Sequence, residues 1–203
     1  MAKRLVMVRH GETDWNAAGR LQGQVDIPLN ETGKAQAREA GEALARRAAE
    51  EGFTWEIVAT SPLGRAVESA ELIAEVLGVE VGDQDDDLVE RAYGELEGLV
   101  GAELDDHERQ RLIVTAEPEE QVAERGAAAL ARIAGHYPDG NVVVVAHGTL
   151  IRLTANRILD QKTPRIPNGV AVEIDAARLA EFVESTRRET PQPTGETEQQ
   201  PAS

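Results

Sequence analysis

The chain has 203 residues, a net charge of −16 and no cysteine. Without cysteine, disulfides, thiolate metal sites and a cysteine nucleophile are excluded, and the negative charge argues against binding to nucleic acid or to an anionic membrane. No apolar run approaches the roughly 20 residues that cross a bilayer, and no signal-peptide core precedes the first predicted strand, so the expected location is the cytoplasm.

Apolar runs typical of strands alternate along the chain with longer segments of helical spacing. The predicted strands are residues 4–8, 56–59, 79–81, 142–146 and 170–174. The predicted helices are residues 31–50, 63–77, 119–136 and 149–159. This alternation favours an α/β fold, with helices on both faces of a mostly parallel central sheet in a three-layer α/β/α sandwich.

Local signals set the expected boundaries of these elements. Asn30 suits the N-cap of the first long helix, Pro62 suits the first turn of the second, and Gly78 suits the position that ends it. The acidic run DQDDD, residues 83–87, is interpreted as an exposed loop, because consecutive acids point in different directions.

The remaining segments are polar. Residues 101–118 are partly helical in pattern and are expected to lie as a short cap over one edge of the sheet. From residue 189 onward there is no apolar pattern, which predicts a disordered tail over 189–203. The chain is therefore expected to hold one catalytic domain over residues 1–188.

Two of the four histidines occupy matching places. His10 follows the apolar run LVMV, His147 follows VVVVA, and each precedes a glycine. Ligands of open α/β sheets bind at the carboxyl ends of the strands, so these two side chains are expected to converge. His107 and His136 lie in polar contexts and are interpreted as structural.

Arginines accompany these histidines. Arg9 directly precedes His10, and Arg65 lies in the first turns of the helix that follows strand 56–59. Glu12 and Asp14 would allow a His/carboxylate metal site, but Arg9 would repel a divalent cation. Two arginines and two histidines at strand ends favour a phosphate pocket instead, because arginine makes bidentate contacts to phosphate oxygens. No metal is expected.

Five motifs together resemble the histidine phosphatase superfamily, the family of phosphoglycerate mutases and related acid-type phosphatases. They are RHGETDWN, GRLQGQVDIPLNETG, SPLGRAVESA, ERAYGELEG and VAHGTLIR. They occur in the family's order over nearly all of residues 3–175. The resemblance implies a phosphoglycerate mutase-like fold and a phosphoryl-transfer site that uses no cofactor.

The same resemblance implies roles for individual residues. His10 would be the nucleophile that forms a phosphohistidine, and Glu90 would be the general acid and then the base. Arg9, Arg65 and His147 would hold the phosphoryl oxygens. The further residues implied to line or contact the substrate site are Asn16, Gln22, Gly23, Gly148, Arg91 and Tyr93.

Three functions fit these motifs: a phosphatase for small phosphomonoesters, a 2,3-bisphosphoglycerate-dependent phosphoglycerate mutase, and a non-catalytic module that binds a phosphorylated ligand. The third is disfavoured because every expected catalytic position is filled. The expected partner is a small phosphorylated metabolite, and the sequence leaves a homo-oligomer open.

The cap favours the phosphatase over the mutase. Gly101 stands where mutases commonly place lysine, and Arg109 and Arg111 are the only cations of the cap. The acidic residues Asp105, Asp106 and Glu108 are expected to repel a carboxylate, and AEPEEQ replaces a PGGES-like stretch of many relatives. A short cap is expected to admit water, which favours hydrolysis.

Overall fold

The computed structural model describes residues 3–189 of the chain. Its strands are β1 (Arg4–Arg9), β2 (Ile57–Thr60), β3 (Glu80–Gln84), β4 (Asn141–Ala146) and β5 (Ala171–Ile174). Its α-helices are α1 (Asp14–Ala17), α2 (Glu31–Glu51), α3 (Gly64–Leu77), α4 (Asp106–Ile113), α5 (Glu119–His136), α6 (Gly148–Leu159) and α7 (Ala176–Glu189). Short 3-10 helices cover Asp86–Leu88 and Gly94–Leu96.

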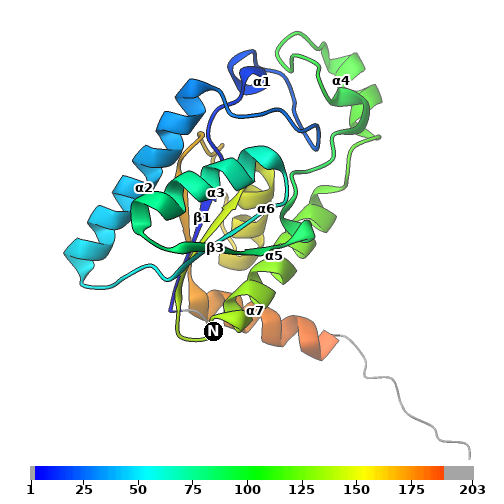
Figure 1. Ribbon diagram of the computed structural model, residues 1–203. Helices are drawn as coiled ribbons and strands as arrows, with labels where there is room; N and C mark the ends of the chain where they lie inside the picture. The colour runs from blue at the N-terminus through cyan, green and yellow to red at the C-terminus, as the bar shows by residue number, and fades with distance from the viewer. Residues whose placement is uncertain (1–2, 190–203) are drawn as a thin grey trace, which may run out of the picture.

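The strands form one sheet in the order β3-β2-β4-β1-β5, in which only β5 is antiparallel among the described strands. Alternate side chains of β1 and β4 face two apolar cores. Leu5, Val142 and Val144 pack with α5, α6 and α7, whereas Val6 and Val143 pack with α2 and α3. The predicted three-layer fold is confirmed (Figure 1).

The register of the sheet places the ends of three neighbouring strands together. β1 pairs with β4 so that Arg9 lies opposite Ala146, and the N–H of His10 donates to the carbonyl of Ala146 at 2.9 Å. On the other side of β4, the N–H of Ser61 donates to Val145 at 3.0 Å, directly after β2. His10, His147 and Ser61 therefore leave the sheet side by side, near the end where Figure 1 shows α1 and α4.

Some local predictions are confirmed and others are wrong. The Asn30 side chain accepts from the Gly33 N–H at 2.8 Å as the N-cap of α2, and Gly78 ends α3 with a φ of 68°. Pro62 lies before the N-cap of α3, not in its first turn. Residues 83–87 do not form an exposed loop, because they continue β3 into a 3-10 helix and Arg132 pairs with Asp85 and Asp87.

The cap and the C-terminal segment differ in how well the sequence predicted them. The partly helical cap contains α4, as expected. Helix α7 was not predicted, although Leu179 at 0% exposure, Phe182 and Val183 give it an apolar face against the core. It continues through Glu189, where a tail was expected, and residues 190–203 lie outside the described part of the chain. None of the described helices has the length and apolar character needed to cross a bilayer.

Candidate active site

A pocket of about 520 Å³ lies at the carboxyl ends of β1 and β4. Most of the predicted site residues line it, and so do several that the sequence did not single out. The lining residues that carry charge or a hydrogen-bonding side chain are Arg9, His10, Asn16, Arg20, Gln22, Arg65, Glu90, Tyr93, Thr149, Arg152 and Arg165.

His10 is held in one orientation at the floor of this pocket. Its Nδ1 lies 2.6 Å from the carbonyl oxygen of Gly11 and must donate to it, which leaves the lone pair on Nε2. The Nε–H of Arg65 lies 3.3 Å from that Nε2. Burial, with the charges of Arg65 and Arg9, holds the pKa of His10 well below its usual range. The imidazole is therefore neutral, and Nε2, which accepts from Arg65, is its candidate nucleophilic atom.

The position after His10 requires glycine because there is no space for a side chain. A Cβ at Gly11 would collide with the carbonyl oxygen of Gly33, and a Cβ at Gly33 would collide with the backbone of Glu12. The N–H of Gly11 also donates to Ser69 Oγ at 3.0 Å. The loop after β1 is thus pressed against the start of α2, and this contact fixes the carbonyl that orients His10.

His147 is fully buried, with its ring centroid 5.1 Å from that of His10. Its Nε2 lies 2.8 Å from Ser61 Oγ, while its Nδ1 has no hydrogen-bond partner among the described residues. Burial and the nearby charge of Arg65 lower the pKa of His147 well below its usual range. A neutral ring that accepts from Ser61 would carry its proton on Nδ1 as a donor.

Two buried arginines flank the histidines. Arg65, 1% exposed, donates to the carbonyls of Gly23 at 2.7 Å and Val25 at 2.8 Å. Burial lowers the pKa of Arg65 to about 10, which leaves it charged at neutral pH. Arg9 donates from NH1 to the carbonyl of Ile166 at 2.7 Å, and its Nε–H is buried without an acceptor in the described structure.

Glu90 meets the start of α6. Its carboxyl oxygens accept from the N–H groups of Thr149 and Leu150, each at 3.0 Å, and from Arg91 at 2.8 Å. The first N–H of the helix, that of Gly148, is not taken by Glu90. The helix therefore holds one carboxyl group beside the pocket and presents one further donor to it.

Two further predicted site residues, Asn16 and Gln22, are linked by a hydrogen bond. Gln22 Oε1 accepts from Thr13 at 2.8 Å and from Asn16 Nδ2 at 3.4 Å, while the buried Gln22 Nε2 has no acceptor among the described residues. Asn16 Oδ1 accepts from Asn168 at 3.1 Å. Gly23 lines the pocket, but its carbonyl already binds Arg65.

Arg91 was expected at the substrate site, but its side chain lies outside the pocket. Its guanidinium donates to the carbonyl of Glu117 at 2.7 Å and to the carboxylate of Glu119 at 3.0 Å, and it does not line the pocket. Its contacts anchor the end of the cap, so a direct contact with substrate is not supported. Tyr93 does line the pocket, and its hydroxyl lies 2.6 Å from that of Thr149.

Three arginines that line the pocket, Arg20, Arg152 and Arg165, were not predicted from the sequence. The cap was expected to set the charge near the substrate, but Gly101 and Ala102 are the only described cap residues that line the pocket, and the acidic residues 105, 106 and 108 do not. Arg152 stands in the quoted motif VAHGTLIR, one helical turn after Thr149, a spacing that could have revealed it. Ser61 and Ser69, both in SPLGRAVESA, were also missed as partners of His147 and Gly11.

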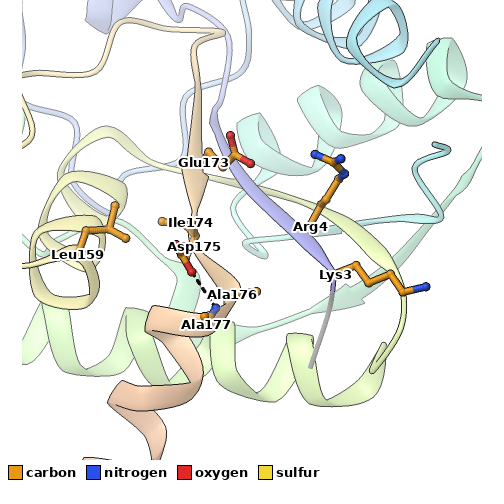
Figure 2. Close-up of a pocket in the computed structure, with 8 residues that line it drawn as sticks. All are labelled: Lys3, Arg4, Leu159, Glu173, Ile174, Asp175, Ala176 and Ala177. Carbon is orange, nitrogen blue, oxygen red and sulfur yellow. Dashed lines mark hydrogen bonds between the residues drawn. The ribbon is translucent and has the colours of Figure 1, made fainter. Parts of the chain in front are cut away.

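A second hollow at the other end of β1 lacks comparable chemistry (Figure 2). Two of its charged groups pair with neighbours: Arg4 with Glu51 at 2.7 Å, and Glu173 with Arg47 at 2.9 Å. Asp175 accepts from the Ala177 N–H at 2.8 Å as α7 begins. His107 and His136 lie on the surface, away from the first pocket, with His136 Nδ1 2.8 Å from Asp83.

The two buried histidines predict a loss of stability in mild acid. Both have folded-state pKa values below the value of about 6.5 in an unfolded chain. The unfolded state therefore binds more protons as the pH falls below 6.5, and the free energy of unfolding should drop by about 2 kcal/mol between pH 6.5 and 5.5. Urea unfolding at several pH values measures this. His10→Asn should lose only about half as much, and an equal loss in both proteins would contradict the burial argument.

Comparison with known proteins finds the same family that the motifs indicated. The family model of the histidine phosphatase superfamily (branch 1) matches residues 5–184 of this chain. An uncharacterised phosphatase of Bacillus subtilis, PhoE, is 40% identical over 152 residues, which are 75% of each chain. A metal-independent phosphoserine phosphatase of Arabidopsis thaliana is 36% identical over 166 residues, covering 76% of this chain and 68% of that protein.

A solved structure shares the arrangement of the chain. The structure of a mycobacterial glucosyl-3-phosphoglycerate phosphatase in complex with VO3 superposes with a TM-score of 0.74 and 31% identity, over 85% of this chain and 90% of that one. Proteins named as phosphoglycerate mutases or mutase-like also match.

Proposed function

Because the chain belongs to the histidine phosphatase superfamily, we propose that it is a metal-independent phosphatase, which hydrolyses small phosphomonoesters through a phosphohistidine at His10. The proposed catalytic unit is a single domain over residues 1–188, and its proposed location is the cytoplasm. Relatives named as phosphatases of phosphoserine and of a phosphoglycerate derivative support this reaction class.

One observation carries the proposal. Three buried nitrogen atoms near His10 lack a hydrogen-bond partner in the described structure: Arg9 Nε, Gln22 Nε2 and His147 Nδ1. An unpaired buried donor costs about 1–3 kcal/mol, so three at one place indicate a missing acceptor-rich ligand. A phosphoryl group has three such oxygens, and it would sit against the His10 Nε2.

The first chemical step transfers the phosphoryl group to the protein. His10 Nε2 attacks phosphorus while the ester P–O bond breaks, and Glu90 gives its proton to the departing oxygen. Arg9, Arg65 and His147 donate to the phosphoryl oxygens, where charge is spread in the transition state. The carbonyl of Gly11 keeps the Nδ1 proton in place as Nε2 becomes bonded to phosphorus.

The second step returns the protein to its starting state. Water attacks phosphorus from the side that the leaving group vacated, and Glu90 takes the water's proton. The P–N bond breaks, inorganic phosphate forms, and His10 recovers the Nε2 lone pair. Thr149 and Leu150 hold the Glu90 carboxyl in one place through both steps.

The mutase remains the second candidate because of one structural observation. Five arginines line the pocket against one carboxylate, Glu90, which suits a substrate with two anionic ends. A mutase must also keep water from the phosphohistidine. The short cap contributes only Gly101 and Ala102 to the lining, which favours hydrolysis. Turnover of any ester would exclude the third candidate, the non-catalytic binding module.

Phosphate release should not require a metal ion. The pocket offers a divalent cation one carboxylate and surrounds it with arginines, and no cluster of three metal-ligating side chains occurs among residues 3–189. A screen of small phosphomonoesters with purified protein in EDTA tests this, with phosphate release as the readout. Activity that disappears in EDTA and returns with a divalent cation would contradict the proposal.

A further inference from the structure

Two pocket arginines have neither a role in the mechanism above nor a hydrogen bond to another described residue. Arg9 and Arg65 lie against His10 and serve the phosphoryl group. Arg20 donates to the carbonyl of Gly98 at 2.6 Å. Arg152 and Arg165 remain, and both line the same pocket as His10 and Glu90. In a chain with a net charge of −16, this concentration of positive charge calls for a ligand with more negative charge than one phosphate.

Arg165 is the less engaged of the two. Its side chain is exposed and forms no ion pair or hydrogen bond with any described residue. It directly precedes Ile166, whose carbonyl accepts from Arg9 at 2.7 Å. The contact with Arg9 therefore fixes the backbone that carries Arg165, and both arginine side chains line the same pocket.

Arg152 approaches the pocket from α6. It lies one turn after Thr149, whose N–H binds Glu90 and whose hydroxyl contacts Tyr93. Its nearest carboxylate oxygen is Glu119 Oε1 at 3.8 Å, and that oxygen is already bound by Arg91 at 3.0 Å. Arg152 is thus weakly held, on the side of the pocket where Glu90 would protonate the leaving group.

The cap supplies no competing cation. Arg109 donates to the carbonyls of Gly101 at 2.8 Å and Leu104 at 3.4 Å, so its guanidinium is used within the cap. Neither Arg109 nor Arg111 lines the pocket. Recognition of a second anionic group would therefore come from α6 and from the loop before β5.

We infer that Arg152 and Arg165 form a subsite for a second anionic group, a carboxylate or a second phosphate, carried by the alcohol part of the phosphomonoester. This inference rests on the proposed phosphatase function and names the substrate class of that site. Charge-assisted contacts from arginine to such groups are among the stronger hydrogen bonds in proteins, so the second anion should raise kcat/KM.

Matched substrates test the subsite. 3-Phosphoglycerate and glycerol 3-phosphate differ only in a carboxylate against a hydroxymethyl group, and glycerol 1,3-bisphosphate replaces it with a second phosphate. We expect kcat/KM to be at least tenfold higher for 3-phosphoglycerate, for glycerol 1,3-bisphosphate or for both than for glycerol 3-phosphate. The ratio of kcat/KM for the ester with a second anionic group to kcat/KM for glycerol 3-phosphate should fall about tenfold in Arg152→Gln and in Arg165→Gln. Arg157→Gln, an exposed position on the same helix that does not line the pocket, should keep the wild-type ratio.

A binding measurement separates this inference from the proposed function. Calorimetry on His10→Asn, which needs no turnover, should show 3-phosphoglycerate or the bisphosphate binding about tenfold more tightly than glycerol 3-phosphate. Adding Arg165→Gln should remove that preference. If no ester is hydrolysed but the preference holds, the phosphatase proposal fails and the subsite stands. If esters are hydrolysed without preference, or if both arginine variants keep the ratio, the subsite is wrong.

Discussion

Replacing His10 with alanine is expected to reduce phosphate release by on the order of 10³-fold or more, while the protein remains folded. The Nε2 of His10 is the proposed nucleophilic atom, because Gly11 holds the other ring nitrogen, and Arg65 gives up its 3.3 Å hydrogen bond to Nε2 when phosphorus approaches. His147 cannot replace it in place, since its Nε2 is bound to Ser61 and its Nδ1 is required as a donor. Steady-state kinetics with p-nitrophenyl phosphate measures the loss.

A matched histidine variant controls for the effect of the substitution itself. His136→Ala removes an exposed imidazole that lies beside Asp83, outside the pocket, and it should retain wild-type turnover. Circular dichroism and thermal unfolding would establish that His10→Ala is folded. Turnover within tenfold of wild type in folded His10→Ala protein would disprove the assignment of the nucleophile.

Replacing Glu90 with glutamine should lower turnover by about 10² to 10⁴-fold for esters with poor leaving groups. An alkyl phosphate departs as a strongly basic alkoxide that needs a proton, whereas p-nitrophenolate leaves without one. The loss should therefore be much smaller in the phosphorylation step with p-nitrophenyl phosphate. Measuring kcat/KM along a series of leaving groups gives a steeper dependence on leaving-group basicity in the variant.

Glu90 also has a structural contact that glutamine alters. The amide oxygen of the glutamine can still accept from Leu150 and Arg91. Its NH2 group, however, would face the Thr149 N–H, which in the wild type donates to Glu90 Oε2. The start of α6 could then shift and lower the rate for every ester alike. A uniform loss across the leaving-group series would show a positional role and would exclude Glu90 as the general acid.

The core of the site could be predicted from sequence because it follows from buried strands. LVMV and VVVVA are apolar enough to be recognised as internal strands, and parallel strands end at one edge of the sheet, so His10 and His147 were expected at the same edge. Their direct neighbourhood depends on the pairing of β1 with β4. Their adjacency to Ser61 depends on β4 lying between β1 and β2. That order results from long-range pairing, which no local pattern encodes.

The parts that the sequence did not predict depend on contacts between distant segments. Arg165 enters the pocket because the loop before β5 folds against β1, where the Gly169 N–H donates to the carbonyl of Arg9 at 3.0 Å. The acidic run at residues 83–87 is ordered by Arg132, more than 40 residues later in the chain. Helix α7 did carry a local signal, since Leu179, Phe182 and Val183 have helical spacing.

The fate of the phosphoryl group on His10 tests the central claim most directly. Phosphorus NMR can follow 3-phosphoglycerate, primed with 2,3-bisphosphoglycerate and kept in EDTA, so that phosphate release and formation of 2-phosphoglycerate are seen in one reaction. A phosphatase whose short cap admits water should produce inorganic phosphate faster than 2-phosphoglycerate. Isomer formation that outruns phosphate release by about tenfold, a difference of about 1.4 kcal/mol between the two barriers, would identify a mutase and contradict the proposed function.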